Sequence, residues 1–157
     1  MDSLRLALYQ PDIPQNAGTL LRLSACLGVP VDIIEPCGFV LDERKVRRAG
    51  MDYIGFADVT RHSSWERFAA TLAEQGRRLV LLTTAGDVRH DRFPFAAGDT
   101  IMVGRESAGV PPEVAQAAQA RIRIPMKAGP RSLNVALAAA LATGEALRRL
   151  DAFPSDQ

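Results

Sequence analysis

The sequence predicts an α/β fold in which a mostly parallel sheet carries helices on both faces. Strand patterns alternate with helix patterns along the whole chain, as expected when crossover helices connect parallel strands. The continuously apolar run at residues 79–82, and a similar run at 100–103, are typical of strands buried on both faces. With 157 residues, 47% of them hydrophobic, the chain is long enough for a sizeable core, and we expect 1–157 to form a single domain.

The first half of the chain combines apolar strands with helices that have clear start or stop signals. One helix carries leucines on a single face and ends before Gly28, a residue suited to a helix C-terminus. Asp42 is a candidate N-cap for a short helix that Gly50 closes, and Ser63 with Glu66 forms the pattern of a capping box. The strands expected in this half are 4–9, 31–34 and 53–57, and the helices are 16–27, 43–49 and 64–75.

The second half repeats the alternation and ends in a long helix rich in alanine and leucine. Pro111 and Pro112 favour a helix start, and Pro125 ends a strand because proline cannot donate to a sheet ladder. Ser132 is a good N-cap for the last helix. The strands expected here are 79–82, 100–103 and 121–124, and the helices are 112–118 and 133–150.

Composition excludes several classes of protein and leaves others open. The net charge of +1 gives no general attraction to nucleic acid, so any basic footprint must be local. Cys26 and Cys37 match no metal or redox motif, and we expect no metal site and a reduced, cytoplasmic setting. The longest nearly apolar run, 135–142, is far shorter than the roughly 20 residues of a membrane helix, so no membrane partner is expected.

Three glycine-bearing loops follow predicted strands. They are Asn16-x-Gly18-x-x-x-Arg22, Gly104-x-Glu106-x-x-Gly109-x-Pro111, and Ile122-x-Ile-Pro-Met126 followed by Ser132-Leu-Asn134. Open α/β sheets bind ligands at the carboxyl ends of their strands, where glycines let backbone groups approach a ligand closely. Each loop alone is weak evidence, and the first is better explained alone as an ordinary loop with a surface arginine, but together they predict one site at one edge of the sheet. The helix N-terminus in the third loop suits an anionic group.

In order and spacing, these loops resemble the three motifs of the SPOUT methyltransferases. The similarity extends over nearly the whole chain and is closest to the small single-domain tRNA (cytidine/uridine) 2′-O-methyltransferases that modify the wobble ribose, nucleotide 34. The resemblance implies a C-terminal trefoil knot, a homodimer, a tRNA substrate and S-adenosylmethionine (SAM) as the methyl donor, with S-adenosylhomocysteine as the product. Sequence rules alone do not predict a knot, because knots are rare exceptions among folds.

The resemblance also assigns roles to individual residues. The residues expected around SAM are Leu82, Thr83, Gly104, Glu106, Ile124, Met126, Ser132 and Leu133. Arg22 matches the arginine proposed as catalytic, and Asn16 matches a residue near the substrate ribose or phosphate. A guanidinium stays protonated at neutral pH, so we expect Arg22 to orient the hydroxyl and stabilise the developing alkoxide, with an RNA phosphate taking the proton. The basic cluster at Arg44, Arg47 and Arg48 is a candidate phosphate-binding surface, or else a solvated helix face.

Four sites depart from the family pattern, and one of them, 135–137, is more apolar than the Ser- and Asn-rich segment of the relatives. Thr19 replaces a usual asparagine, Ala108 replaces a common arginine, and Gly144 replaces a tyrosine of the close relatives, which affects the expected RNA contacts rather than the SAM site. Two other functions remain open: an RNA-binding protein that keeps the fold without catalysis, or ribose methylation at another tRNA or rRNA position. A flavodoxin-like module for a phosphorylated small molecule is a third alternative.

Overall fold

The computed structural model describes residues 3–39, 57–129 and 133–156, and in these ranges seven strands form one sheet. The strand order is β3-β2-β1-β6-β4-β7-β5, and every neighbouring pair is parallel. The strands are β1 (Arg5–Tyr9), β2 (Val31–Ile34), β3 (Val59–His62), β4 (Arg78–Leu82), β5 (Val88–Arg89), β6 (Asp99–Val103) and β7 (Ala120–Arg123). The predicted parallel sheet is therefore confirmed.

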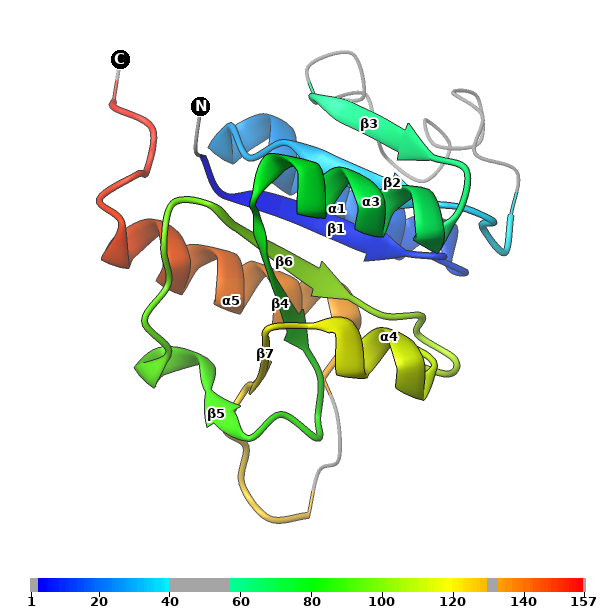
Figure 1. Ribbon diagram of the computed structural model, residues 1–157. Helices are drawn as coiled ribbons and strands as arrows, with labels where there is room; N and C mark the ends of the chain where they lie inside the picture. Colours follow the sequence, from blue (N-terminus) through cyan, green and yellow to red (C-terminus); the bar gives the residue numbers. More distant parts are fainter. Residues whose placement is uncertain (1–2, 40–56, 130–132, 157) are drawn as a thin grey trace.

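Helices cover both faces of this sheet (Figure 1). Helices α1 (Pro14–Leu27) and α5 (Val135–Arg149) pack side by side on one face. Helices α3 (Trp65–Gln75) and α4 (Pro112–Ala117) pack on the other. A short 3-10 turn, η2 (His90–Arg92), follows β5 and contacts α5.

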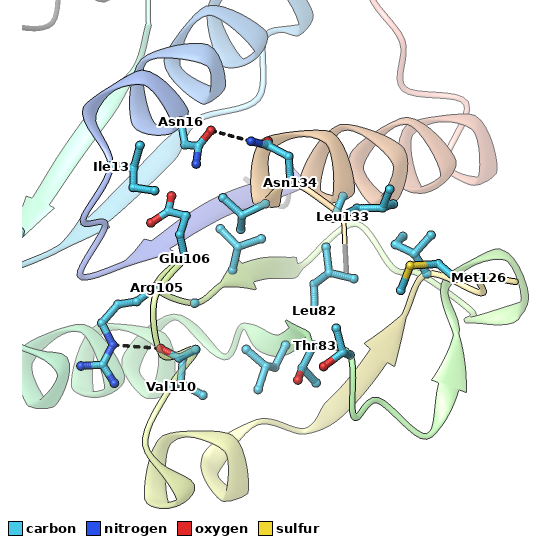
Figure 2. Close-up of a pocket in the computed structure, with 18 residues that line it drawn as sticks. Ile13, Asn16, Leu82, Thr83, Arg105, Glu106, Val110, Met126, Leu133 and Asn134 are labelled. Carbon is cyan, nitrogen blue, oxygen red and sulfur yellow. Dashed lines mark hydrogen bonds between the residues drawn. The ribbon is translucent and has the colours of Figure 1, made fainter. Parts of the chain in front are cut away.

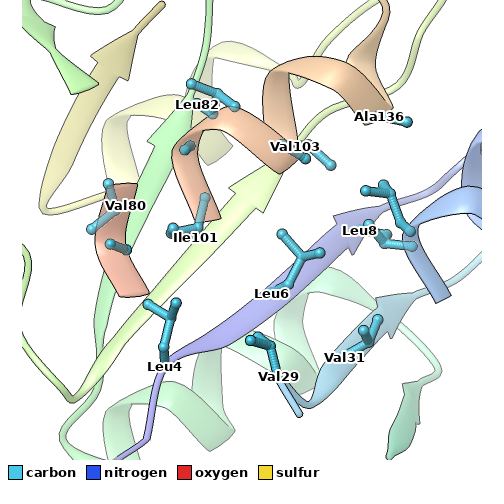
Figure 3. Close-up of a cluster of buried hydrophobic side chains, with 14 of the residues drawn as sticks. Leu4, Leu6, Leu8, Val29, Val31, Val80, Leu82, Ile101, Val103 and Ala136 are labelled. Atoms are coloured by element: carbon cyan, nitrogen blue, oxygen red, sulfur yellow. The ribbon is translucent and has the colours of Figure 1, made fainter. Parts of the chain in front are cut away.

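The strands bury side chains on both faces, as their apolar runs predict. On β1, Leu6 and Leu8 point toward α1 and α5, in the cluster shown in Figure 3, whereas Ala7 and Tyr9 point toward α3 and α4. Each of these four residues is at most 4% exposed. Fully burying one large aliphatic side chain stabilises a fold by about 1.5–3 kcal/mol, so this two-sided core holds the strand ends in place.

Two predicted N-caps are wrong, because a nearby residue caps the helix instead, and α1 begins at Pro14, two residues before its predicted start. Helix α5 begins at Val135, and its N-cap is Asn134 rather than Ser132. Helix α3 is capped by Ser64, whose hydroxyl accepts from the Arg67 N–H at 3.1 Å, so the proposed capping box at Ser63 does not form. In both helices a suitable polar side chain further along the chain takes the capping role.

The predicted helix at 43–49 and nearly all of the predicted strand at 53–57 lie outside the described residues. The structure adds two strands that were not predicted, β3 and β5, one at each edge of the sheet. Thr60 and Arg61 of β3 are exposed, and β5 has only two residues, so neither edge strand shows the apolar pattern of a buried strand.

The strand order places the predicted loops together. From β1 the chain extends to β2 and β3 on one side, then crosses to β4 on the other, with β6 between β1 and β4. The carboxyl ends of β1, β6, β4 and β7 therefore lie along one edge, next to the point where the strand order reverses. Within the described ranges, no helix is long and apolar enough to span a membrane.

Candidate functional site

A cavity of about 510 Å³ opens at the carboxyl ends of β4, β6 and β7 (Figure 2). Its walls come from residues 81–84, the loop after β6, the segment after β7, and the N-terminal turns of α1 and α5. The volume lies within the range of roughly 300–1,000 Å³ that is usual for small-molecule and cofactor sites. All three glycine-bearing loops singled out in the sequence contribute to this one cavity.

Most of the residues predicted around SAM line this cavity. Those in the lining are Leu82, Thr83, Gly104, Glu106, Ile124, Met126 and Leu133. Ser132 lies outside the described residues. The structure thus brings the predicted residues together, and their part in cofactor binding stays a prediction.

The loop after β6 is folded tightly on itself, which explains its glycines. The backbones of Arg105 and Gly109 exchange hydrogen bonds of 3.0 and 2.9 Å. A Cβ atom at Gly104 would lie 2.8 Å from the Gly109 carbonyl carbon, and Gly109 itself has a φ of +61°. Because both positions need glycine, the loop keeps a fixed shape that aims the intervening Glu106 at the cavity.

The opposite wall is apolar and equally fixed. The Thr83 N–H donates to the Ile122 carbonyl at 2.9 Å, which joins the end of β4 to β7. A Cβ atom at Gly86 would lie 2.3 Å from the Ile122 carbonyl carbon, so the turn after β4 rests directly on β7. Leu82 and Met126 then face the cavity, with Met126 38% exposed, and can provide apolar contact to a flat ring.

An amide pair joins α1 to α5 at the rim of the cavity. The Asn134 side-chain amide donates to the Asn16 side-chain oxygen at 3.0 Å, while the Asn134 oxygen caps α5 by accepting from Ala136 and Leu137. Asn16, predicted to bind RNA, is 9% exposed and lines the cavity. Asn134 was not among the predicted site residues, although asparagine is a preferred N-cap and part of the third motif.

The carboxyl group in the cavity lining, Glu106, is paired with a second carboxyl group, Asp12, which lies outside the lining. The Glu106 N–H donates to Asp12 Oδ1 at 3.1 Å, and the Asp12 N–H donates to Glu106 Oε2 at 3.4 Å. Burial raises the pKa of the Glu106 carboxyl, and its hydrogen bond with the Asp12 side chain raises it further. The same hydrogen bond is the main cause that lowers the pKa of Asp12 to about 2. Asp12 was also missed, because nothing in its local sequence indicates a partner 94 positions away.

Of the predicted arginines, only Arg22 lies within the described residues, and it is not at the cavity of the single chain. Arg22 is exposed on α1 and is not part of the cavity lining. Six residues after Asn16, it lies about 9 Å further along the helix axis. Arg44, Arg47 and Arg48 lie outside the described residues. The catalytic and RNA-binding assignments of these four residues therefore stay predictions.

The chemistry of the lining fits SAM. No group of three or more histidine, cysteine, aspartate or glutamate side chains in residues 3–39, 57–129 and 133–156 is arranged to hold a metal. The cavity instead combines apolar walls, backbone donors and acceptors of a fixed glycine loop, and one carboxyl group. Such a lining can enclose an adenine ring and leave a carboxylate to face a positively charged group.

Comparisons with known proteins agree with this geometry. The model of the SpoU rRNA Methylase family matches residues 3–144. A tRNA (cytidine(34)-2′-O)-methyltransferase of Ancylobacter novellus is 54% identical over 151 residues, 96% of each chain. A structure solved for the 2-OH methylation of C/U34 on tRNA superposes with a TM-score of 0.89 at 40% identity, covering 96% of this chain and 97% of that one. An AdoMet-bound rRNA methyltransferase from Sinorhizobium meliloti superposes with a TM-score of 0.85 at 27% identity, covering 94% of this chain and 57% of that one. With its three motifs gathered around one cavity and this match over most of its length, the chain belongs to the SpoU rRNA methylase family.

Proposed function

We propose that this chain transfers a methyl group from SAM to the ribose 2′-hydroxyl of the wobble nucleotide, cytidine or uridine 34, of tRNA. The observation that carries the proposal is the 54% identity, over 96% of each chain, to a relative named for this reaction at cytidine 34. The gathering of all three predicted loops at one cavity supports it.

The cavity at the ends of β4, β6 and β7 is the proposed SAM site. Leu82, Ile124 and Met126 would supply apolar contact to the adenine, and the fixed loop from Gly104 to Gly109 would supply backbone groups to its polar edge. When bound, SAM would supply a sulfonium methyl group for transfer to an oxygen nucleophile, with S-adenosylhomocysteine as the leaving group and no metal required. Most of the rate enhancement would then come from positioning.

The residues of this chain would act mainly on the ribose hydroxyl. Arg22 donates hydrogen bonds to the hydroxyl oxygen and stabilises the negative charge that develops there, while an RNA phosphate takes the proton. Because Arg22 lies outside the cavity lining of the single chain, this role requires the RNA or a second subunit to complete the site. Asn16 already lines the cavity and would orient the ribose or its phosphate, and Arg44, Arg47 and Arg48 would bind further phosphates.

A homodimer is part of the proposal, and α5 offers a surface for it. Leu137 is 59% exposed and Leu141 is 49% exposed, and the two residues lie four positions apart on one face of α5. Large apolar side chains grouped on one helix face are typical of a surface that a partner covers. A second copy of the chain is the partner that the family resemblance implies.

Three further predictions are part of the proposal: a C-terminal trefoil knot, from the resemblance, a single domain over 1–157, from the chain length, and a cytoplasmic location, from the cysteine content. The knot is compatible with the packing of α5 against β4, β6 and η2, three elements that precede α5 in the sequence. A tRNA substrate is consistent with the cytoplasmic location.

Alkaline hydrolysis of treated tRNA tests the proposed function. A 2′-hydroxyl cuts its own neighbouring phosphodiester in alkali, and a methyl group on that oxygen prevents the cut. We expect incubation with SAM to create one alkali-resistant bond, at nucleotide 34. Methyl transfer with an unbroken alkaline ladder would indicate base methylation and refute the ribose assignment. A resistant bond elsewhere in tRNA, or in rRNA, would keep the chemistry and reject the wobble position.

A further inference from the structure

Asp12 joins the loop after β1 to the loop after β6. Its Oδ1 accepts from the Glu106 N–H at 3.1 Å, and its Oδ2 accepts from the Ser107 hydroxyl. In return, the Asp12 N–H donates to Glu106 Oε2 at 3.4 Å. Asp12 thus bonds both the backbone and the side chain of Glu106, although Asp12 itself is not part of the cavity lining.

A third segment holds Asp12 in this place. The Gly38 N–H donates to the Pro11 carbonyl at 2.9 Å. A Cβ atom at Gly38 would lie 2.7 Å from the Asp12 Cβ and 2.9 Å from its Cα, so the chain after β2 presses directly on this residue. With a neighbour on each side, the Asp12 carboxylate has little freedom to leave the loop that it caps.

The side chain that depends on this arrangement is Glu106, which points into the cavity toward Ile13 and Asn16 (Figure 2). Arg105, its neighbour in sequence, turns away: its guanidinium lies 5.5 Å from the centre of the Tyr9 ring and donates to the Gly109 carbonyl. Among the described residues, Asp12 is therefore the ionisable side chain that faces Glu106. The neutral side-chain amide of Asn16, on α1, also forms a hydrogen bond with Glu106.

We propose that Asp12 is a positioning residue of the methyl-transfer site, which holds the Glu106 carboxyl group in the cavity and governs whether that group is charged. This inference rests on the proposed function. A charged Glu106 attracts a sulfonium cofactor and accepts hydrogen bonds from hydroxyl groups, whereas a protonated Glu106 does neither as well. Burial is the main cause that raises the pKa of Glu106, and the hydrogen bond with the Asp12 carboxylate raises it further by favouring the protonated form.

The variant Asp12→Asn separates the charge from the hydrogen bonds. An asparagine oxygen still accepts from the Glu106 N–H, and its amide can donate to the Ser107 hydroxyl. Asp91→Asn is the matched control, because it removes the carboxylate of an exposed ion pair with Arg89, outside the cavity lining. The Glu106 carboxyl carbon is followed by ¹³C NMR, assigned by its loss in Glu106→Gln, and methyl transfer to tRNA is measured across the same pH range.

We expect Asp12→Asn to move the titration of Glu106 to lower pH, because the neighbouring negative charge is gone. The acid limb of kcat/KM should move in the same direction, and Asp91→Asn should change neither. Asp12→Ala removes the hydrogen bonds as well, so kcat should fall on the order of a hundredfold through misplacement of the loop. Thermal unfolding of each variant shows whether the fold is retained.

The inference would be overturned if folded Asp12→Asn changed neither the titration of Glu106 nor the pH dependence of kcat/KM. Asp12 would then be a purely structural link between the two loops. A wild-type protein that methylates no RNA would instead overturn the proposed function. The NMR titration still decides in that event whether Asp12 governs the charge of Glu106, so the two failures are distinguishable.

Discussion

Replacing Asn134 by alanine should loosen both the start of α5 and the rim of the cavity. The Asn134 oxygen accepts from the Ala136 and Leu137 N–H groups at 2.8 and 3.2 Å, and its amide donates to Asn16 at 3.0 Å. Loss of an N-cap costs about 0.5–2 kcal/mol, and loss of a side-chain hydrogen bond about 0.5–1.5 kcal/mol. A combined loss of about 2 kcal/mol corresponds to a fall in Tm of roughly 4–8 °C for a chain of this size.

The same substitution should weaken SAM binding, because the residues around Asn134 line the cavity. They are Val135 and Ala138, in the first turns of α5, and Leu133, just before the helix. If the substitution weakens the binding free energy of SAM by about 1.4 kcal/mol, Kd rises about tenfold. Isothermal titration calorimetry with SAM measures this change, and differential scanning calorimetry measures Tm.

Two further variants isolate the cause. Asn134→Ser keeps a capping oxygen but loses the amide that bonds Asn16, so it should recover most of the stability and only part of the affinity. Ser64→Ala removes the cap of α3, on the opposite face of the sheet, and should lower Tm with no change in Kd. An Asn134→Ala protein with wild-type Tm and Kd would refute both the capping and the wall assignments. Equal loss of affinity in Ser64→Ala would show that Kd follows global stability instead.

Two other predictions concern the RNA side and the assembly. Arg22→Ala should leave SAM affinity nearly unchanged and sharply reduce methyl transfer. Arg67→Ala, which removes an exposed arginine of α3, should reduce neither. Comparable turnover in Arg22→Ala and wild type would remove the catalytic assignment. The double variant Leu137→Glu with Leu141→Glu should shift sedimentation from dimer to monomer, whereas Ala70→Glu on the opposite face should not. A wild-type protein that sediments as a monomer at all concentrations would contradict the proposed dimer.

Local patterns were sufficient to predict the buried parts of the sheet. The run at 79–82 is apolar at every position, and such a run has few alternatives to a strand covered on both sides. The edge strand β3 was not predicted, because Thr60 and Arg61 are polar and exposed to solvent, so the strand lacks the apolar pattern of a buried strand. The N-cap of α5 was misplaced because Ser132 and Asn134 are both suitable caps, and only the path of the chain chooses between them.

The sequence by itself determined the α/β class, the two-sided core strands and the three loops that carry the family motifs, because each depends on residues close together in the chain. The tertiary structure alone decided that β6 lies between β1 and β4, which brings these loops to one cavity. It also decided that Asp12 meets Glu106 and that Asn16 meets Asn134, across 94 and 118 positions. Contacts over such separations leave no periodic trace in the sequence, because they depend on the order of the strands rather than on neighbouring residues.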